Sequence, residues 1–268
     1  MTMEDDAGRP AATVVIVRDR PDGPPDILMM ERASTMAFAA GALVFPGGGV
    51  DAHDHALAAR IDHGLEQDEA AARSAAIRET IEESGLGIGL IGGLNGGVNG
   101  ELAGAVDGPT VLSLRQGLLA GTMLGDLLDS HGLTLALDQL TPFARWHPAP
   151  FEKAIRVYDT RFYIARAPDA QEAVADATEN VHLFWSSATA TLARCDAGDG
   201  RIIFPTRRNL ERLALAGSHA DMIAHAAAHP VEKVRPWVED RDGEQHLCIP
   251  DHLGYPITSE PFWQVRRG

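Results

Sequence analysis

The segment Arg78 to Leu86 (RETIEESGL) concentrates three carboxylates in a stretch with helical periodicity. From about residue 68 to 86, small and apolar residues recur at helical spacing until Gly85 predicts the end of the helix. On such a helix Glu79, Glu82 and Glu83 stand at i, i+3 and i+4 and share one face. Like charges at this spacing destabilise a helix by roughly 0.2–0.5 kcal/mol per pair, so a compensating group is expected. Magnesium, which combines carboxylates with substrate phosphates, is the natural candidate.

The ordinary interpretation of a glutamate cluster is a solvated helix face. Two neighbouring features favour a functional site instead. A short predicted strand and loop ending in FPGGG, residues 45–49, precede the cluster, and the helix-stopping Gly85 follows it. Strand, glycine loop and acidic helix in this order are improbable as an accident of composition.

The rest of the chain alternates predicted strands and helices. Strands are expected at 11–17 and 27–30, which form a hairpin, at 42–45, at 183–185, and as a pair at 143–147 and 156–165. Helices are expected at 187–195 and 206–216 and as two inserted helices within about 109–132, after a glycine-rich loop at 87–108. Residues 230–268, with five prolines, predict an extended tail that wraps the domain. We therefore predict a single enlarged α+β domain over residues 1–268.

The charge balance limits the partners. A formal net charge of -15 argues against a general affinity for nucleic acid or an anionic membrane, since both require basic surface. A phosphorylated small molecule would be repelled too, unless metal cations or clustered arginines intervene. The two cysteines, Cys195 and Cys248, are far apart and predict no disulfide framework, and no apolar run approaches the length of a membrane span. A cytoplasmic location is the expectation.

The acidic segment resembles the Nudix box, whose consensus is G-x5-E-x7-R-E-U-x-E-E-x-G-U with U an aliphatic residue. Residues 78–86 match its fixed positions, with Thr80 at an aliphatic position, and residues 45–48 match the strand and loop that precede it. The consensus glutamate eight residues before Arg78 falls on Ala70. Glu69 and Glu66 are candidate replacements if the entry to the helix is remodelled, and the sequence leaves open which residue takes this place. Residues 51–67 are interpreted as an insertion.

The resemblance implies the Nudix fold, a mixed β-sheet sandwiched between helices (α/β/α), and a hydrolase that uses Mg²⁺ or Mn²⁺. It implies Glu82 and Glu83 as the main metal ligands, Glu79 as the third, and Arg78 as the residue that orients these carboxylates. Glu179 is implied as a further ligand or general base, with an ordinary surface glutamate as the alternative. The implied substrate contacts are Arg32, Gly47, Gly48, Arg145 and Arg161.

The insertion is similar to that of larger Nudix proteins related to coenzyme A diphosphatases, as are the segments TPFARW (141–146) and FPTRRNLERL (204–213). This branch implies hydrolysis of coenzyme A or an acyl-coenzyme A to 3',5'-ADP and a 4'-phosphopantetheine. ADP-ribose, NADH or a nucleotide sugar remains an alternative substrate. An alternative of another class is a catalytically weak Nudix module that senses a nucleotide, which the alanine at position 70 keeps open. The inserted helices offer surface for a homodimer.

Overall fold

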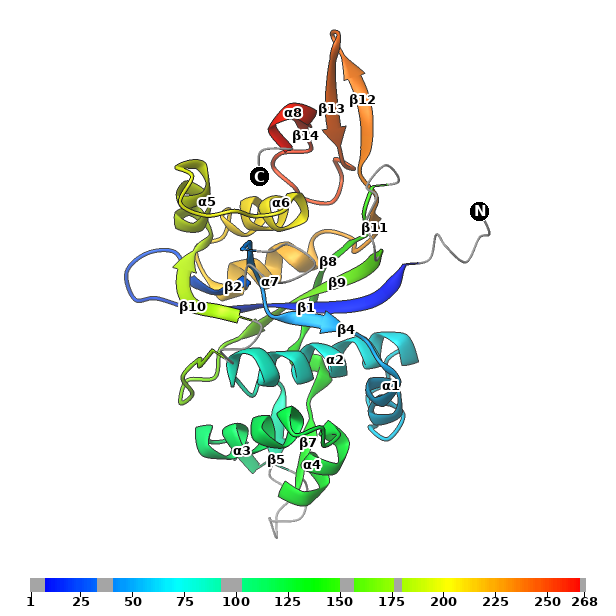
Figure 1. The fold of residues 1–268 in the computed structure, drawn as a ribbon, viewed down its shortest axis with the longest axis vertical. Coiled ribbons are helices and arrows are strands. Elements are labelled where there is room, and N and C mark those ends of the chain that lie inside the picture. Colours follow the sequence, from blue (N-terminus) through cyan, green and yellow to red (C-terminus); the bar gives the residue numbers. More distant parts are fainter. Residues whose placement is uncertain (1–7, 33–40, 93–102, 150–156, 176–179, 266–268) are drawn as a thin grey trace.

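A mixed eight-stranded sheet runs through the middle of the molecule (Figure 1). The computed structural model describes residues 8–32, 41–92, 103–149, 157–175 and 180–265. Six strands follow the order β10-β2-β1-β9-β8-β11, while β3 pairs with β2 and β4 pairs with β1. The β1–β9 and β8–β11 pairs are parallel and the others antiparallel. The strands are β1 (Arg9–Arg18), β2 (Asp26–Arg32), β3 (Leu43–Val44), β4 (Gly47–Gly49), β8 (Thr141–Trp146), β9 (Tyr158–Arg166), β10 (Asn180–Ser187) and β11 (Lys233–Val234).

The central strand β1 explains why the sheet needs a cover on both faces. Its apolar run alternates between two cores, with Val14 and Ile16 in one and Val15 and Val17 in the other, all fully buried. A continuous apolar run of this kind is typical of a strand buried on both sides. The predicted hairpin with β2 is confirmed by the pairing of Val17 with Ile27.

One face carries the acidic helix and the inserted elements. Three alanines of α2 (Ala72, Ala75 and Ala76) are completely buried, and their small side chains let the helix pack closely on the sheet. The predicted box helix and inserted helices are confirmed within one or two residues, whereas the predicted loop at 87–108 includes two short strands. The elements are α1 (Ala52–Ala58), α2 (Gln67–Ser84), β5 (Leu90–Gly92), β6 (Ala103–Ala105), α3 (Gly108–Leu119), α4 (Leu124–His131), β7 (Leu133–Leu135) and the 3-10 turn Leu137–Gln139.

The other face is covered by α5 (Ala188–Asp196), α6 (Phe204–Leu213) and α7 (His219–Ala227). The sheet thus lies between two helical layers, which confirms the expected α/β/α architecture. The helix α7 was not expected from the sequence. Among the helices of the described residues, none combines the length and the apolar character needed to cross a membrane.

The C-terminal segment differs from the predicted extended tail. It forms a second sheet of β12 (Trp237–Arg241), β13 (Glu244–Cys248) and β14 (Ser259–Pro261), followed by α8 (Phe262–Val265), and its β12–β13 hairpin projects from the body in Figure 1. The hairpin turn is Asp242-Gly243, with φ of 55° and 85°. Positive φ at both central residues is the geometry that Asp-Gly favours in two-residue hairpins.

Candidate active site

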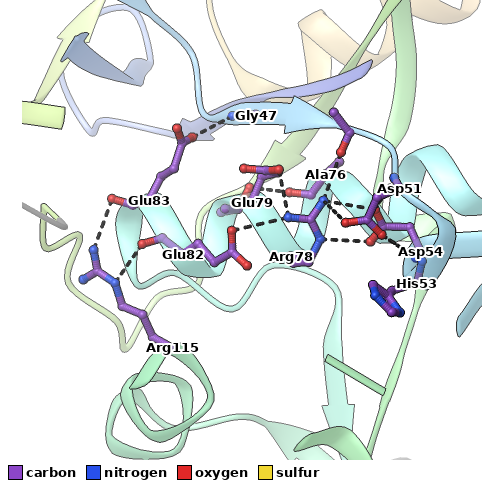
Figure 2. Close-up of polar contacts among 12 residues, drawn as sticks. Gly47, Asp51, His53, Asp54, Ala76, Arg78, Glu79, Glu82, Glu83 and Arg115 are labelled. Atoms are coloured by element: carbon purple, nitrogen blue, oxygen red, sulfur yellow. Dashed lines mark hydrogen bonds and ion pairs between the residues drawn. The ribbon is translucent and has the colours of Figure 1, made fainter. Parts of the chain in front are cut away.

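The three glutamates of α2 lie beside the glycine strand β4 (Figure 2). The Glu83 carboxylate accepts a hydrogen bond from the Gly47 backbone N–H at 2.8 Å, and Glu83 is buried. Glu79 and Glu82 instead converge on Arg78, whose Nη1 donates to them at 2.8 and 3.3 Å. One turn of helix and one guanidinium therefore arrange the acidic cluster that the sequence predicted on a single face.

Glycine is required at two positions of β4 by close approach. A Cβ at Gly47 would overlap the carbonyl oxygen of Ala12, and a Cβ at Gly48 would overlap the carboxyl group of Glu79. The register of β4 on β1, with Gly48 opposite Ala12, fixes this strand directly over the helix. The glycine strand thus provides both a donor for Glu83 and the space that Glu79 occupies.

The buried partner of Arg78 is Asp54 of the inserted helix α1. Arg78 Nε and Nη2 each donate to one Asp54 oxygen at 3.0 Å, and Asp54 is only 2% exposed. Asp54 is positioned by a capping box, in which Asp51 accepts from the Asp54 backbone and Asp54 accepts from the Asp51 N–H. A fork-to-fork pair of this kind fixes the guanidinium plane. The Arg78 side chain is thereby held between Asp54 and the glutamates.

Neither candidate replacement for the box acid, Glu69 or Glu66, contacts Arg78 in the structure. Ala70 is fully buried in the core, Glu69 pairs with Arg73 and Arg161, and Glu66 is exposed where α2 begins. Counting forward from Gly48 rather than backward from Arg78 identifies Asp54 at the sixth residue, as in the consensus G-x5-E. The insertion follows this acid, because residues 55–77 replace the seven residues of the consensus.

Burial makes ionisation of the cluster costly. Burial raises the pKa of Glu79 to about 7 against the opposing effect of Arg78, and it raises the pKa of Glu82 in the same way. Burial also works against the charge on Arg78, but its hydrogen bonds to Asp54 and the nearby carboxylates raise its pKa overall. The carboxylates outnumber the cation, so a further positive charge would favour their ionised forms.

The donor set suits a hard divalent cation, whose preferred ligands are oxygens. Glu79, Glu82 and Glu83 supply carboxylate oxygens from one helix face. Burial raises the pKa of Glu79 to about 7, so a bound cation would favour its ionised form. As the side chains of the described residues stand, no three Asp, Glu, His or Cys already converge as a metal site. Glu79 and Glu82 would exchange a contact with Arg78 for the metal, while Asp54 continues to hold the arginine.

The predicted substrate arginines lie in different environments. Arg145 forms a two-pronged ion pair with Asp159 at 2.7 Å, and Arg161 pairs with Glu69 at 3.3 Å. Glu69 precedes Glu79 by ten residues, which is about 15 Å along a helix. Arg32 ends β2, and its buried Nε has no hydrogen-bond partner among the residues that the structure describes. Glu179 lies outside the described residues.

Two cavities lie on the described part of the molecule. One of about 350 Å³ lies between α1, α2 and the α3–α4 turn and includes Arg78 and Glu82 in its wall. The other, about 450 Å³, is lined by residues such as Arg18, Arg166 and Trp185 at the far end of β1. Arg18 is five residues along β1 from Thr13, the partner of Gly47, which is roughly 16 Å along the strand. Of the two cavities, the smaller has Arg78 and Glu82 of α2 in its wall, whereas the described residues that line the larger one come from other elements.

Of the comparisons with known proteins, the one with solved structures found matches. No protein-family model matches the sequence, and no curated protein is similar to it. Among solved structures, a Nudix hydrolase from Alicyclobacillus acidocaldarius is similar over 83% of this chain and 97% of its own, with 25% identity and a TM-score of 0.68. A MutT Nudix hydrolase from Burkholderia pseudomallei is 17% identical over 76% of this chain and 95% of its own, with a TM-score of 0.40.

The fold and the site together define a class: an α/β/α protein that presents an arginine-ordered carboxylate helix against a glycine strand. The structural match to the Alicyclobacillus enzyme shows that this chain has the fold of a Nudix hydrolase. The residues that resemble the Nudix box form the acidic cluster of this fold.

Proposed function

We propose that this protein hydrolyses the diphosphate linkage of coenzyme A or an acyl-coenzyme A with Mg²⁺ or Mn²⁺, and that its products are 3',5'-ADP and a 4'-phosphopantetheine. The observation that carries the reaction class is the cluster of Glu79, Glu82 and Glu83 ordered by Arg78 and the glycine strand. The choice of coenzyme A rests on the sequence resemblance to the larger Nudix branch. The long insertion after Asp54, whose residues Ala56, Leu57 and Arg60 line the cavity beside Arg78, agrees with that resemblance.

The chain's own residues have separable tasks in this proposal. Glu79, Glu82 and Glu83 hold the cation, which supplies charge neutralisation and Lewis acidity at the diphosphate. Arg78 binds and orients both Glu79 and Glu82, and Asp54 keeps Arg78 in place. Gly47 fixes one oxygen of Glu83, which leaves this carboxylate suited to take a proton from the attacking water. Glu179 is the alternative base from the sequence.

The alternative function, a catalytically weak module that senses a nucleotide, has less support once Asp54 is considered. It drew support from the alanine at position 70, which left the box without its first acid. Asp54 supplies a buried carboxylate to Arg78 by another route, so the polar network around the catalytic glutamates is complete without position 70. A degenerate binding module has no need of such a network.

Product analysis tests the proposal directly. The purified protein would be incubated with Mg²⁺ or Mn²⁺ and coenzyme A, an acyl-coenzyme A, ADP-ribose, NADH or a nucleotide sugar. Preferential formation of 3',5'-ADP from the coenzyme A compounds is the expected result. Preferential cleavage of another compound would retain the reaction class and reject this substrate. Tight binding without any cleavage would support the sensing alternative.

A further inference from the structure

The 350 Å³ cavity beside the acidic helix is built almost entirely by the two inserted segments. Its walls come from α1 and its N-cap, from the α3–α4 turn and the start of α4, and from Arg78 and Glu82 of α2. The volume falls at the lower end of the range of roughly 300–1,000 Å³ typical of ligand pockets. It suits one arm of a substrate rather than a whole dinucleotide.

The floor of this cavity is apolar. Leu57, Leu118 and Leu124 line it and are each less than 9% exposed, while Met123 lies at the mouth with 39% of its surface accessible. The segment after α1 approaches α4 closely at this cavity, since a Cβ at Gly125 would lie 3.0 Å from Arg60 Nη1. A molecule bound in this cavity would therefore contact apolar leucine side chains beneath a polar rim.

Among the described residues that line this cavity, each cation is already paired with carboxylates. Arg60 is held by Asp129 at 2.6 Å, and Arg78 is held by Asp54 and the glutamates. The remaining charged groups of the rim are acidic: Asp51, Asp126 and Glu82. A phosphate-bearing nucleoside would meet repulsion here, whereas an uncharged chain of amides and methylenes would not.

Adjacency to Glu82 fixes which part of a substrate the cavity receives. A diphosphate held at the glutamates would have two substituents, and the one that enters this cavity would pass Arg78 and Glu82, which form part of its wall. We propose that the cavity between α1 and the α3–α4 turn is a specificity subsite for the uncharged, flexible amide chain of the substrate, which is the pantetheine arm if coenzyme A is the substrate. This inference rests on the proposed function.

The test compares substrates that share the diphosphate but differ in the arm. Met123→Trp and Thr122→Trp fill the mouth of the cavity from two exposed positions. Leu119→Trp is the matched control, because Leu119 is 59% exposed on the neighbouring helix and does not line the cavity. KM and kcat would be measured with coenzyme A and with ADP-ribose. Pantetheine, which has no phosphate, would be used as an inhibitor.

We expect both cavity variants to raise KM for coenzyme A at least tenfold relative to KM for ADP-ribose. We also expect weaker inhibition by pantetheine and little change in kcat. Leu119→Trp should behave as the wild type. Equal effects on the two substrates, or unchanged inhibition by pantetheine, would overturn the subsite while leaving the proposed function intact. A wild-type enzyme that cleaves ADP-ribose but not coenzyme A would reject the proposed substrate and the subsite together.

Discussion

Asp54 and Arg78 are 24 residues apart in sequence and form a two-pronged ion pair at 3.0 Å on both arms. The pair joins α1, within which the insertion begins, to the acidic helix α2, and its aspartate is buried. It makes α1 part of the candidate site, since the same arginine contacts Glu79 and Glu82.

Replacement of Asp54 should therefore impair catalysis through Arg78. We expect Asp54→Asn to lower kcat by about 10- to 100-fold, the usual effect of losing a group that orients metal ligands. Stability should fall as well, since a buried charge loses its partner. Steady-state kinetics and thermal unfolding would be measured together, and Asp54→Glu should recover part of kcat. Loss of stability with unchanged kcat would contradict the orienting role.

Glu83 should be indispensable for turnover. It is buried and fixed by Gly47, and the proposed chemistry uses its charge. We expect Glu83→Gln to lower kcat by at least 1,000-fold with little change in the melting temperature, because the amide retains the shape and an acceptor oxygen. Glu66→Gln, on the exposed start of the same helix, is the control. Activity within tenfold of the wild type would reject the assignment of Glu83.

The glycine strand allows a test of geometry without removal of a charge. Gly48→Ala introduces a Cβ that overlaps the Glu79 carboxyl group, whereas Gly49→Ala, one residue away, meets nothing within 4 Å. We expect Gly48→Ala to shift Glu79, raise the Mg²⁺ concentration needed for half-maximal activity and lower kcat. Gly49→Ala should retain both parameters. Similar behaviour of the two variants in a magnesium titration would show that the position of Glu79 is unimportant.

The fold could be predicted where the periodicity of the sequence reflects burial. The apolar run of β1 and the small-residue face of α2 both pack on the core, so both were identified from spacing. β12 escaped prediction because its five residues are all exposed and carry no alternation, and only the Asp242-Gly243 turn signalled the hairpin. The helix α7 escaped prediction because it buries only Met222 and Ala226, and two buried residues give a weak helical pattern.

The candidate site was predictable where its chemistry is local. Glu79, Glu82 and Glu83 are neighbours on one helix, so their common face followed from their spacing. Asp54 joins them only through the packing of α1 on α2, which the spacing within α2 does not determine. Arg161 shows the opposite case: its charge suggested a phosphate contact, but the register of the sheet places it against Glu69.

The second helical layer contains an acid whose ionisation opposes folding. Burial raises the pKa of Glu211 to about 7 despite its ion pair with Arg208, and Glu211 Oε2 is buried without a hydrogen-bond partner among the described residues. A carboxyl group with a raised pKa in the folded state stabilises the fold below its unfolded pKa. That contribution is lost as the pH rises through the folded value. Replacement by glutamine removes this dependence.

We therefore expect the stability of the wild type relative to Glu211→Gln to decrease as the pH rises from 4.5 to 8. The decrease should be on the order of 2–3 kcal/mol, since each pKa unit corresponds to about 1.4 kcal/mol. Urea unfolding of both proteins at several pH values would measure it. A difference that stays constant, or grows with pH, would mean that Arg208 stabilises the ionised Glu211 more strongly than burial disfavours it.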